Sequence, residues 1–226
     1  AKNAFGNDTI YFEKFIQNPR HIEVQIVADG KGNAIHLGTR DCSMQRRHQK
    51  IIEEAPALDI DQVSLEETLK ACLTLCKNIQ YSGVGTLEFL YEDGEFYFIE
   101  MNTRIQVEHP VSEMITGFDL VKAQLKLALN MEITLDQEEI IFRGHAMECR
   151  INAEDPDTFI PSPGIINKMH PPGGFGVRFD AHIYSGYLVP PHYDSLLAKI
   201  ITTANTRESC IKRMLSALDE FFVDGI

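Results

Sequence analysis

The residues best suited to chemistry lie in one short run, residues 100–110, which holds the carboxylates Glu100 and Glu108 together with the amide of Asn102 and an arginine. The run follows the largely apolar residues 95–99, so its polar side chains are expected at the end of a buried strand. Glu100 and Asn102 are two positions apart and share one face of an extended chain, and Arg104 joins them if the strand continues. Buried charges need partners or a metal. This face therefore predicts a divalent cation that handles an anion such as a phosphate, with a solvated strand end as the alternative.

A further carboxylate, Glu88, is expected beside Glu100. Residues 83–90 and 95–101 are predicted to form antiparallel strands joined by a tight turn, and counting across that turn brings Glu88 to the level of Glu100. With Asn102 they offer the hard oxygen ligands that Mg²⁺ or Mn²⁺ prefers. Two carboxylates at that separation repel each other unless a cation lies between them. The alternative is that one of the two glutamates faces water.

Arg104, Glu108 and Arg150 form a second candidate set. An arginine presents a planar fork that matches a carboxylate or bicarbonate. Glu108 could be the base that removes a proton from such an anion, or an acid that stabilises the N-terminus of the helix expected from Pro110. The residue types leave both roles open. Arg150 could equally form a structural ion pair.

The composition is that of an ordinary folded protein. The chain has 226 residues, of which 44% are hydrophobic and 24% charged, enough for one large domain or two small ones with a core. The net charge of -12 argues against unspecific binding of nucleic acid. Residues 46–50 are nevertheless basic, which predicts a small anionic ligand there, with a solvated basic loop as the alternative.

The five cysteines are odd in number, loosely spaced and without a CxxC motif, which indicates free buried thiols in a reducing cytoplasm. Cys72 and Cys76 are one helical turn apart, a spacing that suits half of a metal site. We interpret it as core packing because no second pair accompanies it. No apolar run in the sequence is long enough for a membrane-spanning helix, so we expect a cytoplasmic protein without membrane contact.

Alternating and periodic patterns predict the elements that position these residues, and together they predict an α+β fold. The expected strands are residues 9–16, 21–29, 34–39, 83–90, 95–101, 144–151, 177–181 and 197–202. The expected helices are residues 65–79, 110–130 and 207–222. Residues 21–39 are expected to form a hairpin with one buried face, and Ser64 to cap the first helix, with Glu67 at capping-box spacing. Glycine and proline become frequent near residue 143, which predicts one domain over residues 1–142 and another over residues 143–226.

Five longer runs resemble biotin carboxylase, the ATP-grasp component of acetyl-CoA carboxylase and of other biotin-dependent carboxylases. They are residues 40–50, 53–56, 100–110, 144–155 and 190–195. The resemblance extends over nearly the whole chain. It implies that residues 1–142 are the C-terminal half of an ATP-grasp domain, an antiparallel sheet with helices. Residues 143–226 would then be an incomplete biotin carboxylase C-terminal domain of the α+β class.

The resemblance also implies a role for each matching position. The metal would be bound by Glu88, Glu100 and Asn102. The catalytic residues would be Glu108, as general base, with Arg104, Arg150 and Lys50. Bicarbonate and biotin would contact Gln106, Val107 and Asp194. ATP would contact Glu13, Lys14, Ile16, His21, Gln45, His48 and Leu90. Phe175 and Arg178 match positions at the dimer interface of the family.

The reaction implied is the ATP- and bicarbonate-dependent carboxylation of biotin through carboxyphosphate. It is the first half-reaction of acetyl-CoA carboxylase in fatty acid synthesis. Its cofactors would be ATP with Mg²⁺ or Mn²⁺, and its substrates bicarbonate and biotin on a carrier. The implied partners are the biotin carboxyl carrier protein, a carboxyltransferase and, in the intact family, a second copy of the enzyme.

Parts of the family pattern have no counterpart in these residues. The N-terminal domain, the lid with its glycine-rich phosphate loop and the last C-terminal strands are not found, so we expect a fragment that turns over poorly or not at all alone. Three alternatives remain. The chain could derive from a propionyl-CoA, methylcrotonyl-CoA or pyruvate carboxylase, from an ATP-grasp ligase for another carboxylate, or be a non-catalytic folding or dimerisation unit. Self-association is in doubt, because the family partners of Phe175 and Arg178 lie in the part that is not found.

Overall fold

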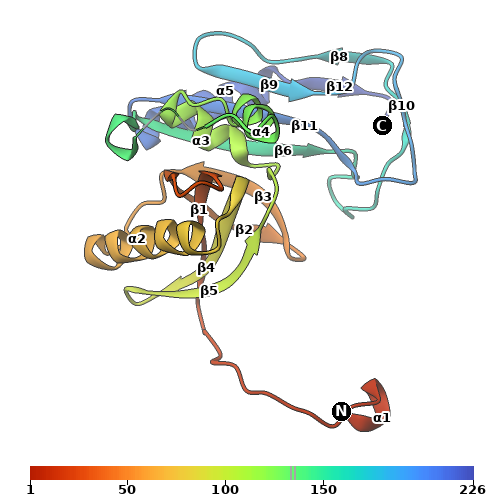
Figure 1. Ribbon diagram of the computed structural model, residues 1–226. Helices are drawn as coiled ribbons and strands as arrows, with labels where there is room; N and C mark the ends of the chain where they lie inside the picture. The colour runs from red at the N-terminus through yellow and green to blue at the C-terminus, as the bar shows by residue number, and fades with distance from the viewer. Residues whose placement is uncertain (133, 135) are drawn as a thin grey trace.

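The computed structural model describes residues 1–132, 134 and 136–226, and its centre is one antiparallel sheet (Figure 1). This sheet has eight strands in the order β5-β4-β1-β2-β3-β6-β11-β9, and two small two-stranded sheets, β10-β7 and β12-β8, lie beyond it. The strands are β1 (Arg20–Asp29), β2 (Ala34–Arg46), β3 (Gln49–Ala55), β4 (Ser82–Glu92), β5 (Glu95–Asn102), β6 (His145–Asn152), β7 (Gly164–Ile165), β8 (Lys168–His170), β9 (Val177–Ala181), β10 (Leu188–Val189), β11 (Leu196–Ala204) and β12 (Phe222–Asp224). The helices are α1 (Lys2–Phe5), α2 (Gln62–Asn78), α3 (His109–Thr116), α4 (Leu120–Ala128), α5 (Arg207–Glu220) and the 3-10 turn η1 (Gln137–Glu139). The α+β class expected from the sequence is confirmed.

The first half of the sheet is covered on both faces. Val24 and Ile26 of β1 pack on one face against Cys72 and Cys76 of α2. Val27 packs on the other face against α4. The expected hairpin is confirmed, since β1 and β2 pair in antiparallel register. The expectation of one buried face is wrong, because β1 buries both of its faces from Ile22 onward. The packing of the two cysteines into the core is confirmed, and all five cysteines are free and buried.

The second half of the sheet is covered by α5 on one face and by α3 on the other. Cys149 and Ile200 pack against α5, while Ala146 and Ile201 pack against α3. Strand β3 pairs with β6 in antiparallel register, so the two halves of the chain share one sheet. The change in composition near residue 143 thus produces no break in the hydrogen-bonded sheet, and the two-domain division stays a prediction.

Three sequence-based expectations are corrected by the structure. Residues 9–16 lie outside any helix or strand, in a segment that runs away from the rest of the chain (Figure 1). Helix α2 begins at Gln62, and its N-cap is Asp61, whose carboxylate accepts a hydrogen bond from the Ser64 N–H. The helix expected over residues 110–130 is two helices. Gly117 ends α3 in the left-handed conformation, with a φ of 71°. Asp119 is the N-cap of α4.

No helix among the described residues is both long and apolar enough to cross a membrane.

Candidate functional site

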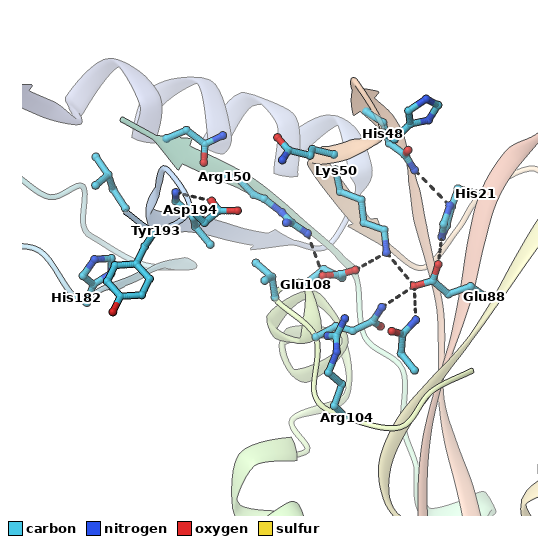
Figure 2. A pocket seen from close by; sticks show the side chains of 18 of the residues that line it. His21, His48, Lys50, Glu88, Arg104, Glu108, Arg150, His182, Tyr193 and Asp194 are labelled. Atoms are coloured by element: carbon cyan, nitrogen blue, oxygen red, sulfur yellow. Dashed lines mark hydrogen bonds and ion pairs between the residues drawn. The ribbon is translucent and has the colours of Figure 1, made fainter. Parts of the chain in front are cut away.

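The polar residues singled out in the sequence converge on one cavity of about 770 Å³ (Figure 2). It is lined by residues of the strands β1 to β6, of the segment before α3, and of the chain from His182 to the start of β11. Expected site residues that line it are His21, Gln45, His48, Lys50, Glu88, Glu100, Asn102, Arg104, Gln106, Val107, Glu108, Arg150 and Asp194.

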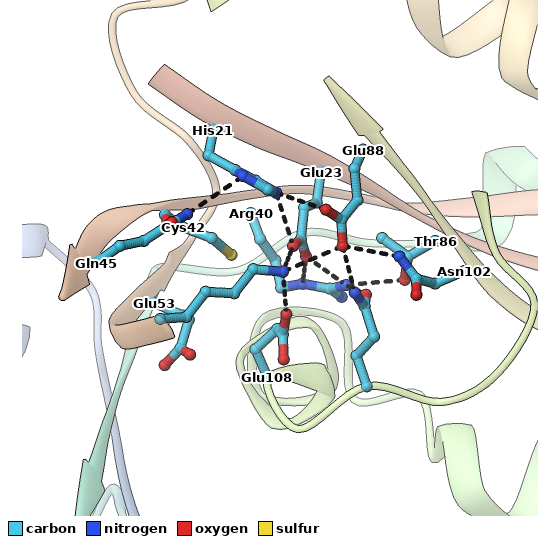
Figure 3. A network of polar contacts seen from close by, with 12 residues as sticks. His21, Glu23, Arg40, Cys42, Gln45, Glu53, Thr86, Glu88, Asn102 and Glu108 are labelled. Atoms are coloured by element: carbon cyan, nitrogen blue, oxygen red, sulfur yellow. Dashed lines mark hydrogen bonds and ion pairs between the residues drawn. The ribbon is translucent and has the colours of Figure 1, made fainter. Parts of the chain in front are cut away.

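A fully buried arginine, Arg40, organises the residues at the base of this cavity (Figure 3). Its Nε donates to Glu23 at 2.9 Å, and its two terminal nitrogens donate to four further side-chain oxygens. The four acceptors are Gln25, Ser112, Thr86 and Gln106. All five N–H groups of a guanidinium are thereby used. Arg40 therefore links three strands to the segment that carries the expected bicarbonate residues.

Lys50 lies above Arg40 and contacts three carboxylates. Its Nζ is 3.1 Å from Glu88 and 2.7 Å from Glu108, and it also donates to Glu23. Burial disfavours the charged lysine, but the negative charges of Glu23 and Glu108 outweigh that cost and raise the pKa of Lys50. Lys50 is thus a positively charged group between Glu88, one of the expected metal ligands, and Glu108.

Glu88, Glu100 and Asn102 lie together on neighbouring strands. The count across the turn predicts Glu88 near the level of Glu100, and a register shift between Glu88 and Phe89 places the two directly opposite each other. The Asn102 Nδ2 group donates to Glu88 at 2.9 Å and to Glu100 at 3.2 Å, so the three side chains converge on one point of the cavity wall. Glu88 is buried, whereas Glu100 is exposed to the cavity side. This donor set suits a hard divalent cation.

His21 adds a positive charge beside that set. Its Nε2 is 2.9 Å from Glu88 and 3.4 Å from Glu23. Burial opposes protonation of the ring, but the hydrogen bonds to Glu23 and Glu88 prevail and raise the pKa of His21 to about 9. Burial likewise opposes ionisation of Glu88, yet the hydrogen bond from His21 and nearby cations lower the pKa of Glu88. Both side chains are therefore charged at neutral pH.

Glu108 is the N-cap residue of α3, but its carboxylate makes no capping hydrogen bond with the described backbone. It instead accepts from Lys50 at 2.7 Å and from the Arg150 Nη2 group at 3.0 Å. Its location matches the helix-terminus alternative, whereas its contacts match the site. Arg150 also donates from Nε to Glu53 at 2.6 Å, so it combines a structural ion pair with a contact in the cavity.

The remaining expected residues at the cavity have looser contacts. Arg104 is exposed and donates to the adjacent Ile105 carbonyl at 3.2 Å. Gln45 donates to the Cys42 carbonyl at 2.9 Å. The Asp194 carboxylate accepts from the Leu196 N–H at 2.8 Å, which fixes its side chain at the far end of the cavity.

Four expected nucleotide residues are not among those that line the cavity. Glu13, Lys14 and Ile16 belong to the N-terminal segment, and Lys14 lines a separate cavity near Tyr91 and donates to the Tyr97 hydroxyl at 2.5 Å. Leu90 is opposite His21 in the β1–β4 register but is absent from the cavity lining. Away from the site, Phe175 is 93% exposed, and Arg178 pairs with Glu113 and Asp180.

Sequence reasoning missed Glu23, Arg40 and Glu53, which are each 0% exposed. Glu23 alternates with apolar residues of β1 and so has the pattern of a solvent-facing side chain. The signal that could have placed Glu23 in the site is its position two residues after His21. Residues two apart in a strand share one face, and this face carries Glu88. Arg40 and Glu53 have no comparable local signal.

Comparisons with known proteins show which family the chain is similar to. The family described as the carbamoyl-phosphate synthase L chain, ATP binding domain, matches residues 1–137, and the biotin carboxylase C-terminal domain matches residues 148–226. Biotin carboxylase of Haemophilus influenzae is 62% identical over 226 residues, which are 100% of this chain and 50% of that protein.

Solved structures give the same result. A biotin carboxylase–beta-gamma-ATP complex from Campylobacter jejuni has a TM-score of 0.92 at 50% identity, and the match covers 100% of this chain and 50% of that one. The biotin carboxylase domain dimer of the Hydrogenobacter thermophilus 2-oxoglutarate carboxylase, with MgADP, ADP and bicarbonate, has a TM-score of 0.92 at 48% identity, with coverages of 99% and 50%. The chain spans about half the length of the relatives it matches. By sequence and by structure, the chain belongs to the biotin carboxylase family.

Proposed function

We propose that this chain supplies the metal, bicarbonate and biotin side of a biotin carboxylase active site. The observation that carries the proposal is the position of Glu108. Its carboxylate is held between Lys50 and Arg150, in the same cavity as the converging Glu88, Glu100 and Asn102. A base thus lies next to a site suited to a metal–phosphate group.

The residues present fit a magnesium ion bound with the ATP phosphates. Asn102 already draws the carboxylates of Glu88 and Glu100 together, and Glu100 is open to the cavity. Bound Mg²⁺ or Mn²⁺ supplies positive charge that offsets the negative charge of the transferring phosphoryl group. Lys50 and His21 add fixed positive charge on the protein side of the same location.

Glu108 would take the proton from the bicarbonate hydroxyl, with Arg104 and Gln106 orienting the anion. The bicarbonate oxygen then attacks the γ-phosphorus of ATP, ADP leaves and carboxyphosphate forms. Carboxyphosphate breaks down to CO₂ and phosphate, and the phosphate removes the ureido N–H proton of biotin. The biotin nitrogen forms its new bond to CO₂ while Arg150 stabilises the negative charge, and Asp194 lies toward the biotin end of the cavity.

The nucleotide would lie against Gln45 and His48, with its ribose near His21. Its base would lie against Leu90 and be read by Glu13, Lys14 and Ile16. The last three belong to the segment that runs away from the fold. We therefore propose that this segment moves against the nucleotide when ATP binds. We also propose a domain boundary at residues 142 and 143, between the two family matches.

The whole enzyme would act in the cytoplasm and catalyse the first half-reaction of acetyl-CoA carboxylase. Its partners would be a biotin carboxyl carrier protein, a carboxyltransferase and a second copy of the enzyme. The acceptor class is set outside this region, since a biotin carboxylase domain of a 2-oxoglutarate carboxylase has the same fold. A parent enzyme of the propionyl-CoA, methylcrotonyl-CoA or pyruvate type is therefore the second candidate.

The test is a calorimetric titration of the chain with ATP, with and without Mg²⁺. We expect magnesium-dependent binding, and a double variant Glu88→Gln/Glu100→Gln should bind at least about tenfold more weakly, which corresponds to about 1.4 kcal/mol. The matched control is Glu66→Gln/Glu67→Gln, two exposed glutamates of α2. Equal affinities for the two double variants would contradict the metal assignment. Because the chain spans half of its relatives, we expect no bicarbonate-dependent ATP cleavage by these 226 residues alone.

A further inference from the structure

Two glutamates that the proposed chemistry does not use lie next to Arg150. Glu53 of β3 and Glu148 of β6 are opposite each other in the antiparallel register, so their side chains share one face of the sheet. That face is covered by α3, and both residues are 0% exposed. Two carboxyl groups are thereby enclosed side by side in the core.

The two carboxyl groups have unequal partners. One oxygen of Glu53 accepts the Arg150 Nε–H at 2.6 Å. The other oxygen of Glu53 and both oxygens of Glu148 have no hydrogen-bond partner among the described residues. A buried carboxylate without a partner costs several kcal/mol, so two ionised groups at this location would be unstable.

The cations that face Glu148 are engaged elsewhere. Arg150, two positions along β6, binds Glu53 and Glu108. Lys199 of β11 donates to the Val107 carbonyl at 2.6 Å, and its Nζ is 3.9 Å from Asp180. The other charged groups near Glu148 are the carboxylates of Glu53 and Glu108, which oppose its ionisation. Burial, above all, raises the pKa of Glu148 well above its usual value.

Glu53 is the member of the pair that can ionise near neutral pH. Burial and the charges of Glu108 and Glu23 raise the pKa of Glu53 to about 7, although Arg150 favours its charged form. Glu53 as a carboxylate has Arg150 as its partner, whereas burial without a hydrogen-bond partner favours the neutral form of Glu148. The pair then carries one negative charge, opposite one guanidinium.

We propose that Glu53 and Glu148 are a positioning pair for Arg150, in which Glu53 holds the guanidinium as a carboxylate and Glu148 lies opposite as the neutral acid. The inference rests on the proposed function, in which Arg150 stabilises charge on the substrates. When Glu108 accepts the bicarbonate proton, Arg150 keeps Glu53 as its counter-ion through Nε. The Nη2 edge, until then bound to Glu108, becomes free to face the anion. An ionised Glu148 would compete with Glu108 for this guanidinium.

The test is NMR on the 226-residue chain, with ¹³C at the glutamate carboxyl carbons and ¹⁵N in arginine. One carboxyl signal should keep the chemical shift of a protonated acid above pH 7 and vanish in Glu148→Gln. The Arg150 Nε–H signal, assigned by its loss in Arg150→Lys, should persist in Glu148→Gln and be lost in Glu53→Gln. In the unsubstituted chain that signal should shift as the pH crosses about 7, which tests the pair even if Glu53→Gln does not fold.

Two results would overturn the proposal. One is that every glutamate carboxyl signal has the carboxylate shift above pH 7. The other is an Arg150 Nε–H signal that neither follows pH nor responds to Glu53→Gln in a folded variant. These measurements contain no nucleotide or bicarbonate, so their failure and a failure of the ATP titration are separate results.

Discussion

Replacing Arg40 with methionine is expected to destabilise this protein by about 3 kcal/mol. The side chain is fully buried and donates to five side-chain oxygens, one of them on the equally buried Glu23. Removing one partner of a buried ion pair costs about 3–5 kcal/mol, because the other charge stays in the core. Glu23 retains Lys50 and His21 as partners, which places the cost at the lower end of that range.

The assay is urea unfolding followed by circular dichroism at pH 7.5. For a chain of this size, 3 kcal/mol corresponds to a melting temperature lower by about 6–12 °C. Arg40→Lys should lie between the two proteins, because an ammonium has at most three N–H donors for five acceptors. The control is Arg143→Met at an exposed position, for which a change within about 0.5 kcal/mol is expected.

The reasoning is refuted if Arg40→Met loses less than about 1 kcal/mol relative to Arg143→Met at an unchanged urea slope. In that case the hydrogen bonds from Arg40 would do no more than offset the cost of burying its charge.

Two further predictions use the same unfolding assay. Burial opposes ionisation of Glu54, but hydrogen bonds from His145 and Arg207 outweigh it and lower the pKa of Glu54 to about 2. The contribution of ionised Glu54 to the free energy of unfolding is therefore present above about pH 4.5 and lost as the pH falls toward 2. Glu54→Gln should lower the free energy of unfolding by about 2 kcal/mol at pH 7 and flatten its pH dependence between about pH 4.5 and 2. Parallel plots of unfolding free energy against pH for the two proteins would contradict this. Gly144 has a φ of 64°, and a Cβ there would lie 2.2 Å from the Ala204 carbonyl oxygen. Gly144→Ala should therefore lower the free energy of unfolding by more than about 2 kcal/mol. A loss below about 1 kcal/mol would show that the backbone adjusts.

Local patterns in the sequence were sufficient to predict the metal side of the site. A tight turn joins the strands of Glu88 and Glu100, so counting residues brings the two side chains to nearly the same level. A register shift between Glu88 and Phe89, which counting does not predict, makes them direct partners. The strand expected at residues 9–16 failed for the opposite reason. Alternation describes a chain that could bury one face, but it does not supply a neighbouring strand, and Phe12 is 94% exposed.

The part of the site around Glu108 and Arg150 could not be derived from residue patterns alone. Glu108 meets Arg150 because α3, which begins after Glu108, packs against β6, a contact between segments far apart in the sequence. The buried charges Glu23 and Arg40 were hidden by a related effect, since a strand covered on both faces buries polar and apolar residues alike. Resemblance to a family located Arg150, and although Glu53 and Glu148 lie in two of the resembling runs, neither pattern nor resemblance gave them a role.

The pairing of β3 with β6 also restricts how the cavity can open. A hinge between the two halves of the chain would have to break the ladder that joins residues 52–55 to residues 146–149. The spacing between the metal-type carboxylates on β4 and β5 and the guanidinium on β6 is therefore set by backbone hydrogen bonds. A change in the width of the cavity is therefore left to side chains and to loops that line it, such as the chain between His182 and Asp194, and not to the sheet.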